Sequence, residues 1–341
     1  MPMSSPSRRS LTGLATAGAL VLSLTACGDG DEETLTVYSG RSEDLVQPLI
    51  DNFAEESGIE VEVRYGGTAE LAAQLLEEGD ESPAEVFLAQ DAGALGAVAA
   101  EGLLVPLPEE TLGQVPQAYR SADGRWVGVT GRARVLVHHE PTVPADELPD
   151  SVLDLTGPEW NGRVGVAPTN ASFQAFVTAL RIQHGDDVAR QWLEDLAAND
   201  PQIRERNGEI VADVDAGSID VGLVNHYYVY ELAQERGVDA EELDVALHFF
   251  PGGDTGGLVN ISGVGLVGES DEQAMELVDH LLSVQGQEYF RDETHEYPLI
   301  EGVDADPGLP SLEELEVPDI DLNDLEDLQT TVTMITEAGL L

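Results

Sequence analysis

The sequence contains no lysine, a single cysteine and few basic residues of any kind. Its 341 residues include 66 acidic side chains against 15 basic ones, all of them arginine, and the formal net charge is −51. Nucleic acids and anionic lipid surfaces repel such a chain, so both are excluded as electrostatic partners. Schiff-base chemistry is also excluded, because it needs a lysine amine. A solvated acidic surface accounts for the charge and attracts cations only without specificity.

The lone cysteine, Cys27, ends a segment with the pattern of a bacterial export signal. Arg8 and Arg9 form a positive start, and the apolar run from Leu11 to Leu24 is too short for an ordinary membrane span. The tetrad from Leu24 to Cys27 resembles the bacterial lipobox, in which the cysteine becomes the lipidated first residue. Without a second cysteine, Cys27 can form neither an internal disulfide nor a cysteine-rich metal cluster.

These features predict where the mature protein resides. We expect residues 1–26 to be a lipoprotein signal peptide and residues 27–34 to be a short acidic tether that begins at lipidated Cys27. The protein would then be extracytoplasmic, held at the outer face of the cell membrane through the lipid anchor only.

Alternating strands and helices predict an α/β fold with two lobes. Apolar strands followed by amphipathic helices recur in a first set over 35–130 and a second set over 131–257. Two predicted strands, Arg125 to Val129 and Arg134 to His138, are joined by Thr130 to Arg132 and cross between the sets, and Ser262 to Val267 is the return crossing. Such a hinged arrangement binds ligands in the cleft between its lobes.

The remaining segments complete the two predicted lobes. Residues 258–300 are assigned to the first lobe. Residues 301–341 are assigned to the second lobe, and the tail from Leu312 to Leu341 is read as two helices that wrap the outside.

A pair of tyrosines stands at the end of one predicted strand. The strand from Ile219 to Val224 is followed by a helix from Val229 to Gly237, with Tyr227 and Tyr228 between them. Open α/β sheets bind ligands at the carboxyl ends of their strands. Phenol oxygens are hard donors that suit a highly charged cation, although packing of the two rings is an alternative interpretation.

A second polar stretch precedes a predicted helix. Thr169, Asn170 and Ala171 follow the strand from Arg163 to Ala167, and the helix continues to about His184. The free amides of a first helical turn form an anion-binding site.

Several blocks in order resemble the ferric-ion-binding substrate-binding proteins of bacterial iron(III) ABC importers. The resemblance runs from about Leu35 to Pro298 and rests on the blocks Val37–Arg41, Gly79–Phe87, Ala89–Leu95, Gly131–Val137, Ala167–Phe173 and Asn225–Tyr228. It implies a type II periplasmic-binding-protein fold, two α/β lobes joined by two crossover strands, with Fe(III) carried between the lobes.

The resemblance also implies a set of site residues. Tyr227 and Tyr228 match the iron-binding tyrosinates, whose protons Fe(III) displaces, so binding weakens as the pH falls. The positions that hold a small anion in the family, phosphate or carbonate, correspond to a further set: Asn225, Asn207, Thr169, Asn170 and Ala171. His226 and Tyr230 are interpreted as scaffold.

The first lobe departs from the family pattern. Ser42 stands where many relatives carry a histidine, and Gln90 stands where they carry a glutamate. Gln90 retains an amide oxygen and is expected as a metal ligand. Anion, water or a chelator would fill the remaining iron positions, and Arg41 and Arg132 could pair with that anion.

No catalytic pattern is present, since the sequence has no nucleophile elbow, no lysine-bearing phosphate loop and no Cys/His metal cluster. We therefore expect a monomeric binding protein, not an enzyme, that passes a ferric ion or ferric chelate to the permease and ATPase subunits of an importer. The alternative is a protein of the same fold for an organic or anionic nutrient, such as a phosphonate, a carboxylate or thiamine.

Overall fold

The computed structural model describes residues 34–268 and 272–341. The predicted signal peptide, Cys27 and the tether up to residue 33 lie outside the described residues, so these predictions are not tested by the structure. Among the described residues, no helix combines the length and the apolar character that a membrane crossing requires.

Within the described ranges, strands form one sheet in the order β2-β1-β3-β10-β5-β8-β6-β7, while β4 pairs with β10, and β9 and β11 pair with β5. The strands are β1 (Leu35–Ser39), β2 (Val61–Tyr65), β3 (Val86–Ala89), β4 (Leu104–Val105), β5 (Val127–His139), β6 (Val164–Val166), β7 (Gln202–Ile203), β8 (Val221–Asn225), β9 (Val245–His248), β10 (Val259–Val267) and β11 (Tyr297–Pro298).

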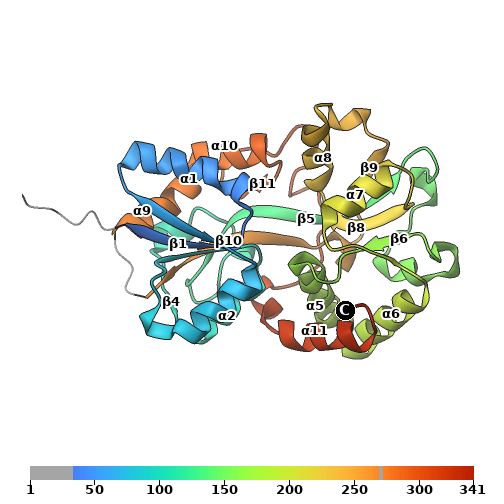
Figure 1. The fold of residues 1–341 in the computed structure, drawn as a ribbon, viewed down its shortest axis with the longest axis horizontal. Helices are drawn as coiled ribbons and strands as arrows, with labels where there is room; N and C mark the ends of the chain where they lie inside the picture. The colour runs from blue at the N-terminus through green and yellow to red at the C-terminus, as the bar shows by residue number, and fades with distance from the viewer. Residues whose placement is uncertain (1–33, 269–271) are drawn as a thin grey trace, which may run out of the picture. The chain divides into compact units, whose positions relative to one another are not determined.

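Helices cover both faces of this sheet (Figure 1). The α-helices are α1 (Glu43–Ser57), α2 (Thr68–Glu78), α3 (Ala92–Ala100), α4 (Glu109–Leu112), α5 (Ala171–His184), α6 (Asp186–Ala198), α7 (Asn207–Asp215), α8 (Tyr228–Arg236), α9 (Glu272–Leu281), α10 (Val284–Glu293) and α11 (Leu328–Glu337). Short 3-10 helices are η1 (Gly79–Glu81), η2 (Gln117–Tyr119), η3 (Ala145–Glu147), η4 (Val152–Thr156), η5 (Pro158–Trp160), η6 (Ala240–Glu242), η7 (Thr255–Gly257) and η8 (Leu322–Glu326).

Local sequence explains how the parallel units form. In α1 the buried residues Val46, Leu49, Ile50 and Phe53 recur at helical spacing and turn one face toward the sheet. Gly58 ends the helix with a φ of 76°, which a residue without a side chain adopts readily. β1 then pairs in parallel with both β2 and β3, and β8 pairs in parallel with β6. The carboxyl ends of neighbouring strands therefore lie at one edge of each unit.

The crossing strand differs from the sequence prediction. Two strands were predicted on either side of residues 130–132, whereas the structure has one continuous strand, β5, of 13 residues. The reason is that Thr130 and Gly131 pair with β10 on one side and with β11 on the other, so the ladder is not interrupted. Farther along, β5 pairs with β8 and β9. β5 and β10 thus run between the two groups of helices (Figure 1).

Buried apolar residues divide into separate clusters on either side of this crossing. One cluster draws most of its members from residues 35–129 and 258–299. Two others draw theirs mainly from residues 135–250. This division agrees with two lobes, whose limits stay a prediction.

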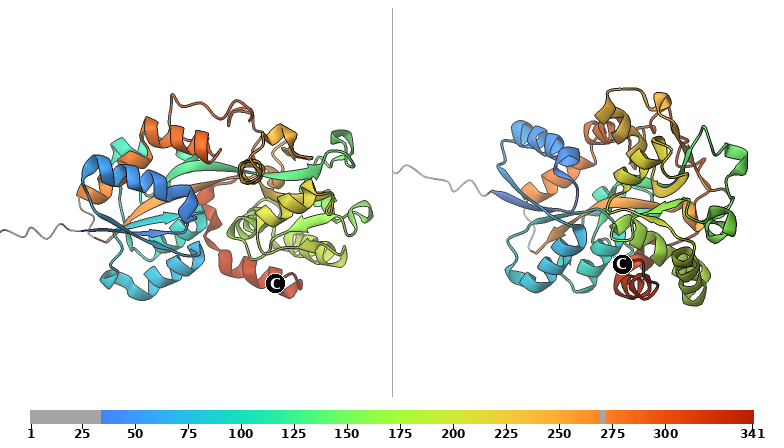
Figure 2. Two further views of the ribbon diagram at one scale, coloured as in Figure 1. Left: turned by 45° about the horizontal axis from the view of Figure 1, so that its top comes forward. Right: turned by 45° about the vertical axis from the view of Figure 1, so that its right-hand side comes forward.

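The C-terminal tail joins both groups of helices. Leu322 and Leu325 pack in the first cluster, whereas Met334 and Ile335 pack in the second. The sequence prediction assigned all of residues 301–341 to the second lobe as two helices; the structure has η8 and α11 instead, with α11 beside α5 and α6 (Figure 2).

Candidate functional site

The tyrosine pair lies at the carboxyl end of β8, as the sequence predicted. β8 ends at Asn225 and α8 begins at Tyr228, so the pair occupies the turn between them. Tyr227 is 1% exposed, and the two rings lie 4.4 Å apart at an interplanar angle of 30°. The two hydroxyl groups are close enough to form a hydrogen bond. Consecutive residues therefore place two phenol oxygens at one point.

The surroundings keep Tyr228 protonated in the metal-free protein. Burial raises the pKa of Tyr228 well above its ordinary value of 10.0, and neighbouring Tyr227 raises it further, while a hydrogen bond from Asn207 opposes this shift. A cation that binds the phenolate must therefore displace a tightly held proton.

Three guanidinium groups, those of Arg41, Arg132 and Arg134, are at most 2% exposed. Arg41 and Arg134 are within electrostatic range of both tyrosines, and Arg132 is within range of the adjacent His226. The sequence singled out Arg41 and Arg132 but missed Arg134. Arg134 could have been predicted from its spacing to Arg132, because alternate residues of a strand share a face. The opposite charges of deprotonated Tyr228 and Tyr227 would act directly on Arg134.

Arg134 has spare capacity to donate hydrogen bonds. It donates from Nη1 to Ser172 Oγ (3.2 Å) and from Nη2 to the Leu223 carbonyl (3.0 Å). Its buried Nε has no partner among the described residues. Burial lowers the pKa of Arg134 to about 9, so a nearby anion would stabilise its charged form.

Several predicted anion contacts meet at Ser172. Asn170 caps α5 and accepts hydrogen bonds from Ser172 N (2.9 Å) and Oγ (2.6 Å). Asn207 donates from Nδ2 to the same Oγ at 3.2 Å, and its buried Oδ1 has no partner in the described part of the chain. Asn225 is buried and is the ladder partner of Arg134. Ser172 itself was not predicted.

The other two predicted anion residues are placed differently. The Thr169 side chain is exposed, and its hydroxyl donates to the Glu205 carbonyl at 3.4 Å. Ala171 is the first residue of α5 and is half-buried. Only its backbone can serve an anion.

The first lobe presents its residues at the ends of β1 and β3. Gln90 is half-buried, and its backbone N–H donates to Thr68 Oγ1 at 3.2 Å. Asp91 caps α3, and burial raises its carboxyl pKa, while Arg132 opposes the rise. Ser42 is exposed at the start of α1. The role of Gln90 as a metal ligand stays a prediction.

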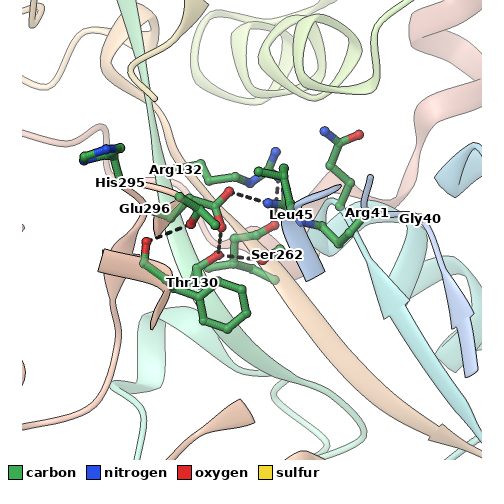
Figure 3. Close-up of polar contacts among 12 residues, drawn as sticks. Gly40, Arg41, Leu45, Thr130, Arg132, Ser262, His295 and Glu296 are labelled. Atoms are coloured by element: carbon green, nitrogen blue, oxygen red, sulfur yellow. Dashed lines mark hydrogen bonds and ion pairs between the residues drawn. The ribbon is translucent and has the colours of Figure 1, made fainter. Parts of the chain in front are cut away.

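Arg41 is fixed by a carboxylate that the sequence did not single out. Its Nη2 lies 2.6 Å from Glu296 Oε1, and Thr130 donates to Glu296 Oε2 at 2.8 Å (Figure 3). Burial by itself would lower the pKa of Arg41, but the charge and hydrogen bond of Glu296, together with the charges that Tyr227 and Tyr228 carry when deprotonated, raise it above its ordinary value. Glu296 lies 255 residues from Arg41, and no local pattern connects them.

Within residues 34–268 and 272–341, no group of three or more His, Cys, Asp or Glu side chains is arranged to hold a metal ion. The tyrosine pair can still supply two hard oxygens to a cation.

His226 has a structural role, as its sequence position suggested. The ring is fully buried, its Nδ1 accepts from Ala133 N at 3.2 Å, and its Nε2 lies 2.7 Å from the His295 carbonyl oxygen. His226 thus ties the tyrosine turn to β5 and to the start of β11. Tyr230 stacks on His295 with ring centroids 4.3 Å apart.

The buried imidazole predicts acid sensitivity of the metal-free fold. Burial lowers the pKa of His226 to about 4 from 6.5. The unfolded chain takes up the proton first, so His226 makes the folded state progressively less stable as the pH falls from about 6.5 to about 4, by roughly 3 kcal/mol at most. Urea unfolding across this range should therefore show a weaker pH dependence for His226→Phe than for the parent; equal slopes would contradict the assignment.

The chain belongs to the bacterial extracellular solute-binding protein family, whose pattern matches residues 81–324. It is similar to the Fe(3+)-binding periplasmic protein of Serratia marcescens, with 34% identity over 95% of this chain and 96% of the relative. It is also similar to the major ferric iron-binding protein of Neisseria meningitidis serogroup B, with 33% identity over 83% of this chain and 84% of the relative.

Solved structures agree with these relatives. Iron-bound HitA from Pseudomonas aeruginosa matches with a TM-score of 0.85 and 34% identity, over 90% of this chain and 99% of that one. The Trichodesmium protein (IdiA) (FutA), solved with iron and citrate ligands, matches with a TM-score of 0.77 and 27% identity over 90% of this chain and 99% of that one. The predicted type II periplasmic-binding-protein fold is confirmed by this agreement.

Proposed function

We propose that this protein captures Fe(III) in the cleft beside Tyr227 and Tyr228 and delivers it to an ABC importer. The observation that carries the proposal is the convergence of two phenol oxygens from consecutive residues at the end of β8. Membership of a solute-binding family and similarity to proteins named for ferric ion support it. The protein is a binding and transport protein, as these relatives are, and not an enzyme.

The residues of the pair account for the choice of metal. Fe(III) is a hard, acidic cation that prefers oxygen donors and displaces phenol protons. Asn207 donates toward Tyr228 and stabilises its phenolate. Gln90 is proposed to supply an amide oxygen from the first lobe.

The charges around the pair favour an anion bound together with the iron. Two tyrosinates and one Fe(III) leave a net charge of about +1, and the buried guanidinium groups of Arg132 and Arg134 add positive charge, whereas that of Arg41 is paired with Glu296. A small anion such as phosphate or carbonate, or a carboxylate chelator, would offset this charge. We assign its contacts to Arg134, Ser172 and Asn207, which already share hydrogen bonds. The proposed set is completed by Asn170, Asn225, Arg41, Arg132 and the backbone at Thr169 and Ala171.

Substitution of Arg134 tests the anion assignment. Arg134→Gln should lower iron affinity in phosphate or citrate buffer by roughly tenfold or more, because a charge-assisted contact to the anion is lost. A matched control is Arg163→Gln, which removes a half-exposed arginine that pairs with Asp220 near the opposite end of β8. Competition titrations with nitrilotriacetate measure the iron affinity of both variants. Equal affinities for Arg134→Gln and the parent would refute the assignment.

Cellular location and partners extend the proposal. The lipobox-like tetrad ending at Cys27 would anchor the protein at the outer face of the membrane, and a permease with its ATPase subunits would accept the iron from a monomer. Cys27→Ala should move the protein from the membrane fraction to the soluble fraction of cells; retention at the membrane would argue against this anchor.

The proposed function is tested by adding ferric citrate to metal-free protein. We expect a visible tyrosinate-to-iron absorption band and a higher melting temperature, because a ligand that binds the folded state stabilises it. The departures at Ser42 and Gln90 motivate the alternative of an organic or anionic nutrient, which the relatives do not favour. A screen in which a phosphonate, a carboxylate or thiamine raised the melting temperature, while ferric chelates had no effect, would support that alternative instead.

A further inference from the structure

A buried carboxylate, Glu296, is linked through Arg41 to the proposed iron site. Glu296 is 1% exposed and pairs with Arg41, whose side chain is also buried. Burying both charges costs solvation that only a close, hydrogen-bonded pair offsets. Glu296 differs from the many exposed acidic residues of this chain because its buried charge is only weakly screened by solvent and salt.

Three separate parts of the fold hold the Glu296 carboxylate in place. Arg41 reaches it from the turn after β1, at 2.6 Å. Thr130 of β5 donates to its second oxygen at 2.8 Å and lies 2.6 Å from the Ser262 hydroxyl of β10. Figure 3 shows the carboxylate between Arg41 and Thr130. Both crossing strands therefore fix its position.

Arg41 connects this carboxylate to the tyrosines. Its Nε and Nη1 are buried and have no partner among the described residues, so the Glu296 contact uses only part of the guanidinium. The charges that Tyr227 and Tyr228 would carry as tyrosinates would act on Arg41, which places the ion pair within electrostatic range of the proposed ligands. Glu231 of α8 also interacts with both Arg41 and Glu296.

We propose that Glu296 is a specificity-determining residue of the ferric site: by neutralising Arg41, it sets the net charge of the cleft and thereby the charge of the anion with which iron is held. This inference rests on the proposed function. With Glu296 ionised, the Arg41–Glu296 pair contributes no net charge, and the anion has to balance the iron, the tyrosinates, the remaining arginines and nearby Glu231.

The charge balance predicts how a substitution changes anion preference. Glu296→Gln keeps the shape of the side chain and its contact with Thr130, but leaves the positive charge of Arg41 without compensation. A more highly charged anion then becomes the better partner for iron. Citrate carries one more negative charge than hydrogen phosphate at slightly alkaline pH. The substitution should therefore increase the iron affinity in citrate relative to that in phosphate.

The test compares the apparent Fe(III) affinity in citrate with that in phosphate, at the same free Fe(III) activity set by a nitrilotriacetate buffer. Glu296→Gln should raise the citrate-to-phosphate affinity ratio by roughly tenfold over the parent. The double variant Arg41→Gln with Glu296→Gln removes both charges together, so its ratio should return to within about twofold of the parent. A purely structural cost of the unpaired Arg41 would weaken iron binding in both buffers alike and would leave the citrate-to-phosphate ratio unchanged.

The matched control is Asp215→Asn, which removes another buried, arginine-paired carboxylate. Asp215 pairs with Arg236 at the far ends of α7 and α8, away from the tyrosine turn. The citrate-to-phosphate affinity ratio of Asp215→Asn should equal that of the parent. If Glu296→Gln does not fold, Glu296→Ser makes the same charge change and leaves space for water beside Arg41.

Each outcome has one meaning for the inference. The inference is overturned if the citrate-to-phosphate affinity ratio is unchanged in Glu296→Gln, or if it does not return to the parent value in the double variant. Either result leaves the proposed function intact. If the parent protein itself binds no Fe(III) in either buffer, the proposed function fails, and the inference fails with it.

Discussion

Metal-free protein in which Tyr227 and Tyr228 are both replaced by phenylalanine should show no visible band with ferric citrate. Its iron affinity should fall by at least roughly a thousandfold, since losing even outer-shell partners of a metal costs ten- to a hundredfold. Both rings remain, so the buried packing around Tyr227 is kept. Visible spectra and competition titrations measure the two effects.

Tyr230→Phe is the matched control because Tyr230 lies in the first turn of α8, close in sequence to the tyrosine pair. Tyr230 stacks on His295 and is not part of the converging pair. We expect the parent band and nearly the parent affinity. A double phenylalanine variant that still turned purple-red with iron would show that the metal binds elsewhere.

Acidification should release the iron steeply. Burial raises the pKa of Tyr228 well above 10.0, so the metal-free site holds its proton throughout the neutral range. Each tyrosinate that binds Fe(III) releases one proton, and protons therefore compete more strongly as the pH falls. With two tyrosinates, affinity should drop by roughly a hundredfold per pH unit, before any protonation of the anion adds to the effect.

Proton release on iron binding measures this directly in weakly buffered solution. About two protons per iron are expected when ferric ion is supplied as a preformed chelate and the protons that the released chelator takes up are added to the measured number. Single replacements Tyr227→Phe and Tyr228→Phe should each reduce the number by about one. An affinity independent of pH would contradict tyrosinate ligation.

Local sequence was sufficient for the tyrosine turn and insufficient for its surroundings. An apolar strand that ends before a helix predicts a turn at a sheet edge, and β8 and α8 form it within a residue or two of the predicted limits. The continuity of β5 was not predictable, because it depends on pairing with β10 and β11, which follow more than a hundred residues later.

The arginines illustrate the same limit. Arg132 and Arg134 are alternate residues of one strand, so the sequence pattern can identify them as a pair. The contact of Arg134 with Ser172, however, forms only when β5 and α5 pack together. Glu296 is farther from any local signal, since its partners come from β5 and from the turn after β1. The net charge of the site therefore depends on tertiary contacts that local sequence does not reveal.

The departures in the first lobe acquire a physical meaning in this setting. Ser42 is exposed and Gln90 carries no charge, while Arg41 and Arg132 are buried nearby. The first lobe thus supplies the buried Arg41–Glu296 ion pair, and the crossing strand β5 adds the buried cation Arg132. This arrangement favours iron that arrives with an anion over the bare ion.

The central claim, that Fe(III) binds to Tyr227 and Tyr228, is tested most directly by a crystal structure of the protein grown with ferric citrate, with anomalous diffraction measured at the iron edge. The account predicts one anomalous peak in contact with both phenol oxygens, with the anion density on the side of Ser172 and Arg134. An anomalous peak away from the tyrosine pair, or a cleft that contains an organic ligand and no iron, would contradict it.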